Sequence, residues 1–161
     1  MKKKILSWAA FLLLTFGGSQ AGFCQEKTLP ELTVTAKSNI TKAVRESFEK
    51  TFPDAENQQW SKVNKNFLVR FISEEQKNHA LFTKSGYLIY HITYGTEANM
   101  PEDLRKKVQS TYQPYSITRV AHVRQADRDI WVVNLETDKK LVLARVEEGE
   151  VEEVGNYEKT L

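Results

Sequence analysis

Three histidines are the residues of this sequence best suited to proton transfer or metal binding, namely His79, His91 and His122. They form no His-x-x-x-His pair, and the only cysteine, Cys24, lies near the N-terminus. A zinc site would therefore have to assemble from side chains on separate strands. The spacing favours histidines on the surface of hairpins, and we predict no bound metal and no internal disulfide.

Other catalytic or ligand-binding signatures are weak in this sequence. Acidic residues gather near the C-terminus without the Asp/Asn and Gly pattern of a calcium-binding loop, which indicates a solvated face. These residues are Glu147, Glu148, Glu150, Glu152 and Glu153. No Gly-x-Ser-x-Gly, phosphate-binding loop or dinucleotide motif occurs, and no spacing pairs a nucleophile with a base. We expect a protein that is not an enzyme and uses no cofactor.

The elements that must position any site follow a pattern that occurs twice. In the first half, apolar residues at i, i+3, i+4 and i+8 predict one face of a helix. These residues are Ile40, Ala43, Val44 and Phe48. Asn39 is the expected N-cap, and Pro53 ends the helix because proline lacks the amide proton. In the second half, Pro101 opens a helix with a stripe formed by Leu104, Val108 and Tyr112.

Each predicted helix is followed by strands. Residues 60–72 read as one extended segment with a turn or bulge near 64–66, and strands follow at 79–83 and 87–94. Phe67, Val69 and Phe71 alternate with Leu68 and Arg70, so we expect the first three to point toward the helix. Strands at 117–123, 130–135, 141–146 and 151–154 repeat this order. Trp131, Val133 and Leu135 are the expected inward set of the second half.

The sequence therefore predicts an α+β fold of tandem α-β-β-β repeats, over about residues 39–95 and 99–158. Each half alone has too little core to be stable. We expect the halves to form one antiparallel sheet with two helices packed on one face.

The sheet face away from the helices is the predicted binding surface. If Phe67, Val69 and Phe71 point inward, a polar and aromatic set points outward. That set is Arg70, Tyr87, His91, His122, Arg124 and Asn134. Arg, Tyr and His beside exposed aliphatic residues are typical of protein-binding patches. The alternative is an ordinary mixed sheet surface, covered by residues 26–38, and a shift of one residue in register would invert the set.

The N-terminus has the order of a secretory signal peptide over residues 1–24. Lys2, Lys3 and Lys4 precede a short apolar run at 5–16, and small residues follow. The run is shorter than the ~20 apolar residues of a transmembrane helix, although a retained anchor is the alternative. Cleavage is expected after Ala21 or Cys24, and lipidation of Cys24 is a less favoured reading. Residues 25–38 read as a linker or a lead-in strand.

The charge balance excludes some partners. The chain carries 23 Lys and Arg against 21 Asp and Glu, and loss of the leader lysines leaves a nearly neutral domain. Such a balance gives no electrostatic reason to expect nucleic acid or an anionic membrane as a partner. We expect no membrane span in the mature chain and a periplasmic or secreted location.

The order of these motifs resembles the PepSY-like family of exported bacterial proteins, described as β-lactamase-inhibitor-like. The resemblance rests on Phe52-Pro53-Asp54-Ala55, Trp60, the strand at 67–71, Gly86 and Pro101. It implies a tandem α-β-β-β fold, export to the periplasm or beyond, no known catalytic residues and protein binding through an exposed sheet face. The second half departs from the pattern, because Pro114 and Tyr115 replace a Phe-Pro-x-Ala motif.

Two functions are compatible with this sequence. The first is a non-enzymatic exported module that binds or modulates an envelope or secreted protein through the open sheet face. The second is a periplasmic protein that binds a small ligand or glycan with aromatic residues in a groove of the sheet. A broad shallow face would favour the first function, and a deep pocket with converging polar groups would favour the second.

Overall fold

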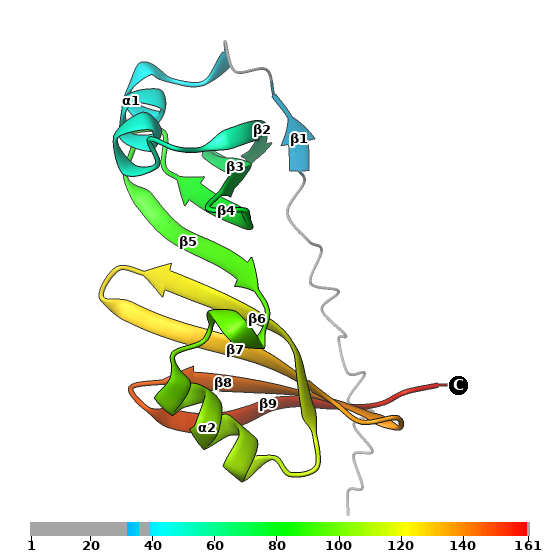
Figure 1. The fold of residues 1–161 in the computed structure, drawn as a ribbon. Helices are drawn as coiled ribbons and strands as arrows, with labels where there is room; N and C mark the ends of the chain where they lie inside the picture. The colour runs from blue at the N-terminus through cyan, green and yellow to red at the C-terminus, as the bar shows by residue number, and fades with distance from the viewer. Residues whose placement is uncertain (1–31, 36–38, 161) are drawn as a thin grey trace, which may run out of the picture.

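The computed structural model describes residues 32–35 and 39–160, which form one antiparallel sheet with two α-helices (Figure 1). Nine strands follow one another across the sheet in sequence order, from β1 to β9. The elements are β1 (Leu32–Val34), α1 (Lys42–Thr51), β2 (Glu56–Val63), β3 (Asn66–Ser73), β4 (Gln76–Phe82), β5 (Leu88–Gly95), the 3-10 helix η2 (Glu97–Asn99), α2 (Glu102–Thr111), β6 (Ser116–Gln125), β7 (Arg128–Glu136), β8 (Lys140–Glu147) and β9 (Glu150–Glu158).

The predicted signal peptide and Cys24 lie outside the described residues. Strand β1 falls within the segment 25–38 and pairs antiparallel with β2, with Thr33 opposite Lys62. Within the described ranges, no helix has the length and apolar character needed to cross a membrane.

Helix α1 begins two residues later than the sequence indicated. Thr41 is the N-cap, and its hydroxyl oxygen accepts a hydrogen bond from the Val44 amide at 3.3 Å. The prediction that Asn39 caps the helix was therefore wrong. Both residues are good caps, and Thr41 has a further bond that holds it in place, from its hydroxyl to the Lys84 carbonyl at 2.9 Å. At the other end, Pro53 follows the C-cap Phe52, as predicted.

Each half contains four strands after its helix. The sequence predicted four for the second half but only three for the first, and the predicted α-β-β-β repeat also counts three. In the first half, the extended segment 60–72 is two strands, because Asn64 and Lys65 form a two-residue turn between β2 and β3. Asn64 has a φ of 55°, a left-handed conformation that asparagine tolerates better than most residues. The predicted α+β class, the single antiparallel sheet and the placement of both helices on one face are confirmed.

The strand register identifies the two faces of the sheet, since directly paired residues point to the same side. Ala80, which packs below α1, pairs with His91, and His91 pairs with Arg124. Farther along β6, Val120 belongs to the core below α2 and pairs with Val133. Both helices therefore cover the same side, which we name the helix face. The opposite side is named the open face.

Two apolar clusters lie on the helix face, one below each helix. The cluster below α1 is largely aromatic, and Phe48 is at its centre, with ring centroids 5.2 Å from both Trp60 and Phe71. The cluster below α2 is mainly aliphatic around Val108 and also contains Trp131. The two inward sets predicted from the alternation, at 67–71 and 131–135, are confirmed as members of these clusters.

Gly86 brings α1 close to the sheet. Its φ of +88° is unfavourable for residues with a side chain, and a Cβ there would lie 2.6 Å from the Ala43 carbonyl oxygen. The turn after β4 therefore contacts the helix backbone directly. This contact fixes the position of α1 and of the Phe52–Asp54 turn that follows it.

Candidate functional site

The six residues predicted to share the open face are divided between the two sides of the sheet. Arg70 and Asn134 lie on the open face, where they pair with His79 and Leu143 respectively. The remaining predicted residues, His91, His122, Arg124 and Tyr87, do not lie there. The first three are on the helix face, and Tyr87 precedes β5 in the exposed turn after Gly86.

The placement of His91, His122 and Arg124 was wrong because the side on which a residue lies depends on register. Ala80 is buried below α1, and its partner His91 must point the same way. The β4–β5 pairing also shifts at Leu81/Phe82, so alternation counted from Tyr87 is not maintained along β5. This bulge puts His91 on the helix face, and Arg124 follows because it pairs directly with His91.

On the open face, an arginine, a histidine and a tyrosine lie together across β3, β4 and β5. Arg70 pairs with His79, and the Tyr94 hydroxyl lies 3.1 Å from His79 Nδ1. The Tyr94 and His79 rings meet edge to face, with centroids 4.9 Å apart. Tyr94 remains 38% exposed. We name Arg70, His79 and Tyr94 the open-face cluster.

Burial and charge both affect the titration of this cluster. Burial raises the pKa of Tyr94, while the nearby Arg70 guanidinium opposes the change. Burial and, to a lesser degree, Arg70 lower the pKa of His79, which favours the neutral imidazole. The cluster therefore presents one positive charge, on Arg70, beside a neutral aromatic pair at neutral pH.

Apolar side chains surround the open-face cluster on neighbouring strands. The pairing register places Leu81 opposite Tyr90 and Ile92 opposite Val123, all on the open face and all partly exposed. On β7, Ile130 pairs with Val123 and Val132 pairs with Ala121, so both also lie on the open face. Further members are Leu68, Ile72 and Leu143. The open face is therefore a mainly apolar surface with a polar aromatic cluster at one end.

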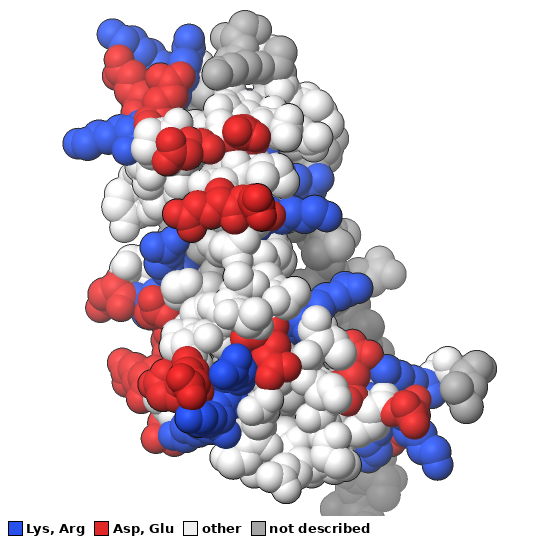
Figure 2. Space-filling model, in the orientation of Figure 1, with Lys and Arg blue, Asp and Glu red and all other residues white. Residues whose placement is uncertain are grey.

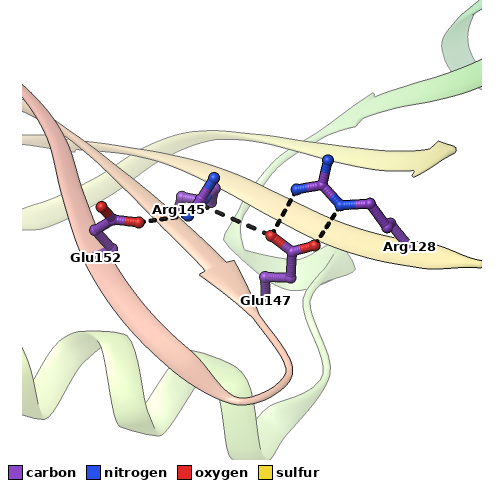
Figure 3. A network of polar contacts seen from close by, with 4 residues as sticks. All are labelled: Arg128, Arg145, Glu147 and Glu152. Atoms are coloured by element: carbon purple, nitrogen blue, oxygen red, sulfur yellow. Dashed lines mark hydrogen bonds and ion pairs between the residues drawn. The ribbon is translucent and has the colours of Figure 1, made fainter.

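The other end of the open face is charged (Figure 3). Arg128 holds Glu147 through two nitrogens, at 2.6 and 2.8 Å. Arg145 bonds Glu152 at 2.5 Å and lies 3.9 Å from Glu147. Two members of the acidic C-terminal group are thus paired with arginines. On the side of the molecule seen in Figure 2, charges of both signs are interspersed, with no patch of a single sign.

A polar groove lies on the helix face, between the two apolar clusters. Its volume is about 570 Å³. It extends from the turn after α1, at Phe52–Asp54, across β4 and β5 to His122 and Arg124 on β6. The helices cover the sheet on either side of this strip, and polar side chains line the strip together with the apolar Phe52 and Leu88. We name it the seam groove.

A continuous hydrogen-bond chain forms the floor of the seam groove. Arg124 Nη2 lies 3.0 Å from His91 Nδ1, and a guanidinium has only donors, so Nδ1 must accept. The ring proton is therefore on Nε2, which donates to Asn78 Oδ1 at 2.9 Å. Thr93 donates to the same oxygen, and the Asn78 amide nitrogen donates to the Gln76 carbonyl at 2.8 Å.

His91 is neutral in this arrangement. It is only 6% exposed, and Phe52 packs against its ring with centroids 4.7 Å apart. Burial lowers its pKa to about 4, and the charges of Arg124 and His122 contribute. Protonation would also replace the acceptor at Nδ1 with a donor facing Arg124, which adds a geometric reason for the neutral form.

His122 has a different environment at the edge of the seam groove. Its ring stacks on Trp131 with centroids 4.3 Å apart and an interplanar angle of 4°. Nε2 lies 2.8 Å from an oxygen of Asp129. A second, smaller hollow of about 130 Å³ adjoins this stack, near Gly95 and Asn99.

Sequence reasoning missed several of these residues. Tyr90, Tyr94 and His79 are on the open face, and Asn78 organises the seam groove. The alternation along β5 could have found Tyr90 and Tyr94 if the register had been known. Asn78 has only a weak signal, a polar amide inside an otherwise regular strand. Across 32–35 and 39–160, no three His, Cys, Asp or Glu side chains are close enough to share a metal ion.

The fold matches several solved structures. A BLIP-like protein from Bacteroides fragilis superimposes with a TM-score of 0.62 at 17% identity, covering 75% of this chain and 91% of its own. A DUF2874 family protein from Bacteroides uniformis gives a TM-score of 0.61 at 14% identity, with coverages of 73% and 88%. The chain has a BLIP-like fold. A third structure with this fold, from Bacteroides eggerthii, has a TM-score of 0.60 at 14% identity and coverages of 73% and 88%.

The BLIP-like fold agrees with the β-lactamase-inhibitor-like part of the resemblance found in the sequence. The PepSY part of that name is not confirmed. No protein-family model matches the sequence, and no curated protein matches it. At these identities the likeness concerns the fold alone.

Proposed function

We propose that this chain is a non-enzymatic exported binding protein that holds an envelope or secreted protein against its open face. The observation that carries the proposal is the open-face cluster. Arg70 and Tyr94 lie on the side of the sheet that neither helix covers, next to partly exposed aliphatic residues. Arginine and tyrosine next to apolar area are the residue types enriched at energetically important positions of protein interfaces.

The shape of the open face supports a protein as the partner. Its apolar members extend over β3 to β8. Its polar members are the open-face cluster, the charged network on β7 to β9, and Arg119 and Asn134 between them. An extended apolar centre with a polar rim is the usual anatomy of a protein interface. Asn134, near the charged end, is a candidate rim residue that could form a hydrogen bond with a partner.

The proposed location is outside the cytoplasm. The N-terminal pattern predicts export, and the structural neighbour from Bacteroides eggerthii is provisionally described as periplasmic. The Bacteroides fragilis neighbour is described as BLIP-like, which supports a binding role without naming a partner for this chain.

Site-specific photo-crosslinking tests this proposal. The photoreactive residue p-benzoylphenylalanine replaces Tyr94 in the full exported chain, and a matched variant carries it at Glu49, which is exposed on α1. After irradiation of whole cells, we expect a discrete adduct with another protein from the Tyr94 position only. Equal adducts from both positions, or none from Tyr94, would contradict the proposal.

A further inference from the structure

The seam groove has the size of a small-molecule site and lies on the face opposite the open-face cluster. Its volume of about 570 Å³ is within the ~300–1,000 Å³ usual for ligand pockets. Residues from separate parts of the chain meet there, namely the end of α1 and the turn after it, the end of β3 and the turn to β4, and strands β4, β5 and β6. It is independent of the proposed protein-binding surface.

Arg124 is held in the groove by a neutral partner. Its only hydrogen bond to another side chain among the described residues is to His91 Nδ1, and that ring is fixed in turn by Asn78. Asp129, which pairs with Arg124 across the strands, contacts His122 instead. Within 32–35 and 39–160, Arg124 has no carboxylate at ion-pair distance. Its remaining N–H groups are available for a carboxylate.

Two carboxylates line the same groove from the other side. Asp54 follows α1, and Glu74 lies in the two-residue turn between β3 and β4. In the described part of the chain, neither forms an ion pair with a lysine or arginine. Glu74 has a φ of 51°, a conformation unusual for glutamate at a position where glycine or asparagine is common. The groove therefore offers a positive and a negative side.

The separation of these charges indicates the length of a ligand. Strands β3 and β6 are three strand spacings apart, or about 14 Å at the ~4.8 Å of neighbouring strands. The pairing places Arg124 in the same row as Val69, and Glu74 is five residues farther along, about 16 Å at ~3.3 Å each, so the two backbone positions are about 22 Å apart. The long side chains of Glu74 and Arg124 close about half of that gap, and the remaining length corresponds to about three extended residues. Phe52 and Leu88 add apolar surface between the charged groups.

We propose that the seam groove binds a short peptide with free termini. The C-terminal carboxylate pairs with Arg124, the N-terminal ammonium pairs with Asp54 and Glu74, and an apolar side chain rests against Phe52 and Leu88. The His91–Asn78 chain acts as the support that holds Arg124 in place.

Calorimetric titration of the whole chain with three peptides tests this site. The probes are the tripeptide Ala-Leu-Ala with free termini, its N-acetylated form and its C-terminal amide. We expect saturable binding of the free peptide and at least tenfold weaker binding of each capped form. Arg124→Gln is expected to abolish the difference between the free and amidated peptides. Asp54→Asn combined with Glu74→Gln is expected to abolish the difference between the free and acetylated peptides.

Arg119→Gln is the matched control, because Arg119 is an exposed arginine on the same strand that pairs on the open face. This variant is expected to retain the full discrimination. Circular dichroism and thermal unfolding establish that each variant is folded. The absence of saturable binding at millimolar free peptide would overturn the proposal. So would equal affinities for the free and amidated forms, or unchanged discrimination in Arg124→Gln. None of these outcomes bears on crosslinking at Tyr94.

Discussion

The two faces of the sheet differ in how their side chains are satisfied. On the helix face, α1 and α2 each cover an apolar cluster. In the seam between them, Arg124 donates to His91, His91 donates to Asn78, and the Asn78 amide donates to the Gln76 carbonyl. On the open face, aliphatic and tyrosine side chains remain partly exposed around Arg70. The two apolar clusters thus stabilise the sheet from one side, and the other side keeps partly exposed apolar side chains.

The largest expected effect is the loss of stability caused by a substitution in the apolar cluster below α1, on the helix face. Phe48 is 1% exposed and lies against four aromatic rings, those of Phe52, Trp60, Phe71 and Phe82. Phe48→Ala should reduce the free energy of unfolding by about 3–5 kcal/mol because it leaves a cavity. Ile92→Ala, on the partly exposed open face, should cost less than about 1.5 kcal/mol. Denaturant unfolding measures both, and equal losses would contradict the assignment of the two faces.

The next effect is a pH dependence that arises from His91. Its folded pKa of about 4 is below the unfolded value of 6.5, so the unfolded chain binds the proton first as the pH falls. Stability should therefore be full above pH 6.5 and decline as the pH falls toward 4. The total decline is at most about 3.5 kcal/mol, since each pKa unit corresponds to ~1.4 kcal/mol.

The measurement is the free energy of unfolding between pH 7 and 4.5 for the wild type and His91→Gln. The variant should lack most of the decline. His79→Gln is the control from the open face, where the histidine is only partly buried. A decline that survives in His91→Gln would show that other groups cause it.

Loss of the Asn78 side chain in the seam should reduce the free energy of unfolding more than loss of an asparagine side chain on the open face. Asn78 is 3% exposed, and its loss leaves the His91 N–H and the Thr93 hydroxyl without their shared acceptor. Asn78→Ala should cost about 1–3 kcal/mol in the free energy of unfolding. Asn134→Ala, on the open face, should cost less than about 0.5 kcal/mol. Chemical denaturation compares the two, and similar values would show that the seam is not specifically stabilising.

The smallest expected effect concerns the charged end of the open face. Arg128 and Glu147 form a bidentate pair in solvent, and salt screens such pairs. Arg128→Gln should change thermal stability less than Phe48→Ala or Asn78→Ala, and the change should vanish at 1 M NaCl. Thermal unfolding at low and high salt measures this. A large loss that persists at high salt would mean that the pair is structural.

Sequence patterns predicted the two helices and the inward-facing strand residues because such patterns report local periodicity. The inward residues at 67–71 and 131–135, the proline stops and the helix stripes all follow from spacing along one element. They also placed Arg70 correctly, since it lies between Val69 and Phe71 on the same strand. The turn at Asn64–Lys65 was not recognised as a strand boundary, because it lacks the glycine that usually marks a two-residue hairpin.

The candidate sites were harder to predict because they depend on contacts between strands. His91 and Arg124 are 33 positions apart, and only the register of β5 with β6 brings them together. Bulges at Leu81/Phe82 and Ile117/Arg119 shift the registers of the neighbouring pairs, β4 with β5 and β6 with β7, without a clear sequence signal. The open-face cluster was found only in part for the same reason.

The most direct test of the binding role of the open face is quantitative capture of partners from envelope extract. The baits are the wild type, the open-face double variant Arg70→Ala/Tyr94→Ala, and the matched α1 double variant Lys42→Ala/Glu49→Ala. Mass spectrometry should identify a protein recovered equally by the wild type and the α1 variant, and at least tenfold less by the open-face variant. Equal recovery of every protein by all three baits would contradict the binding role assigned to this face.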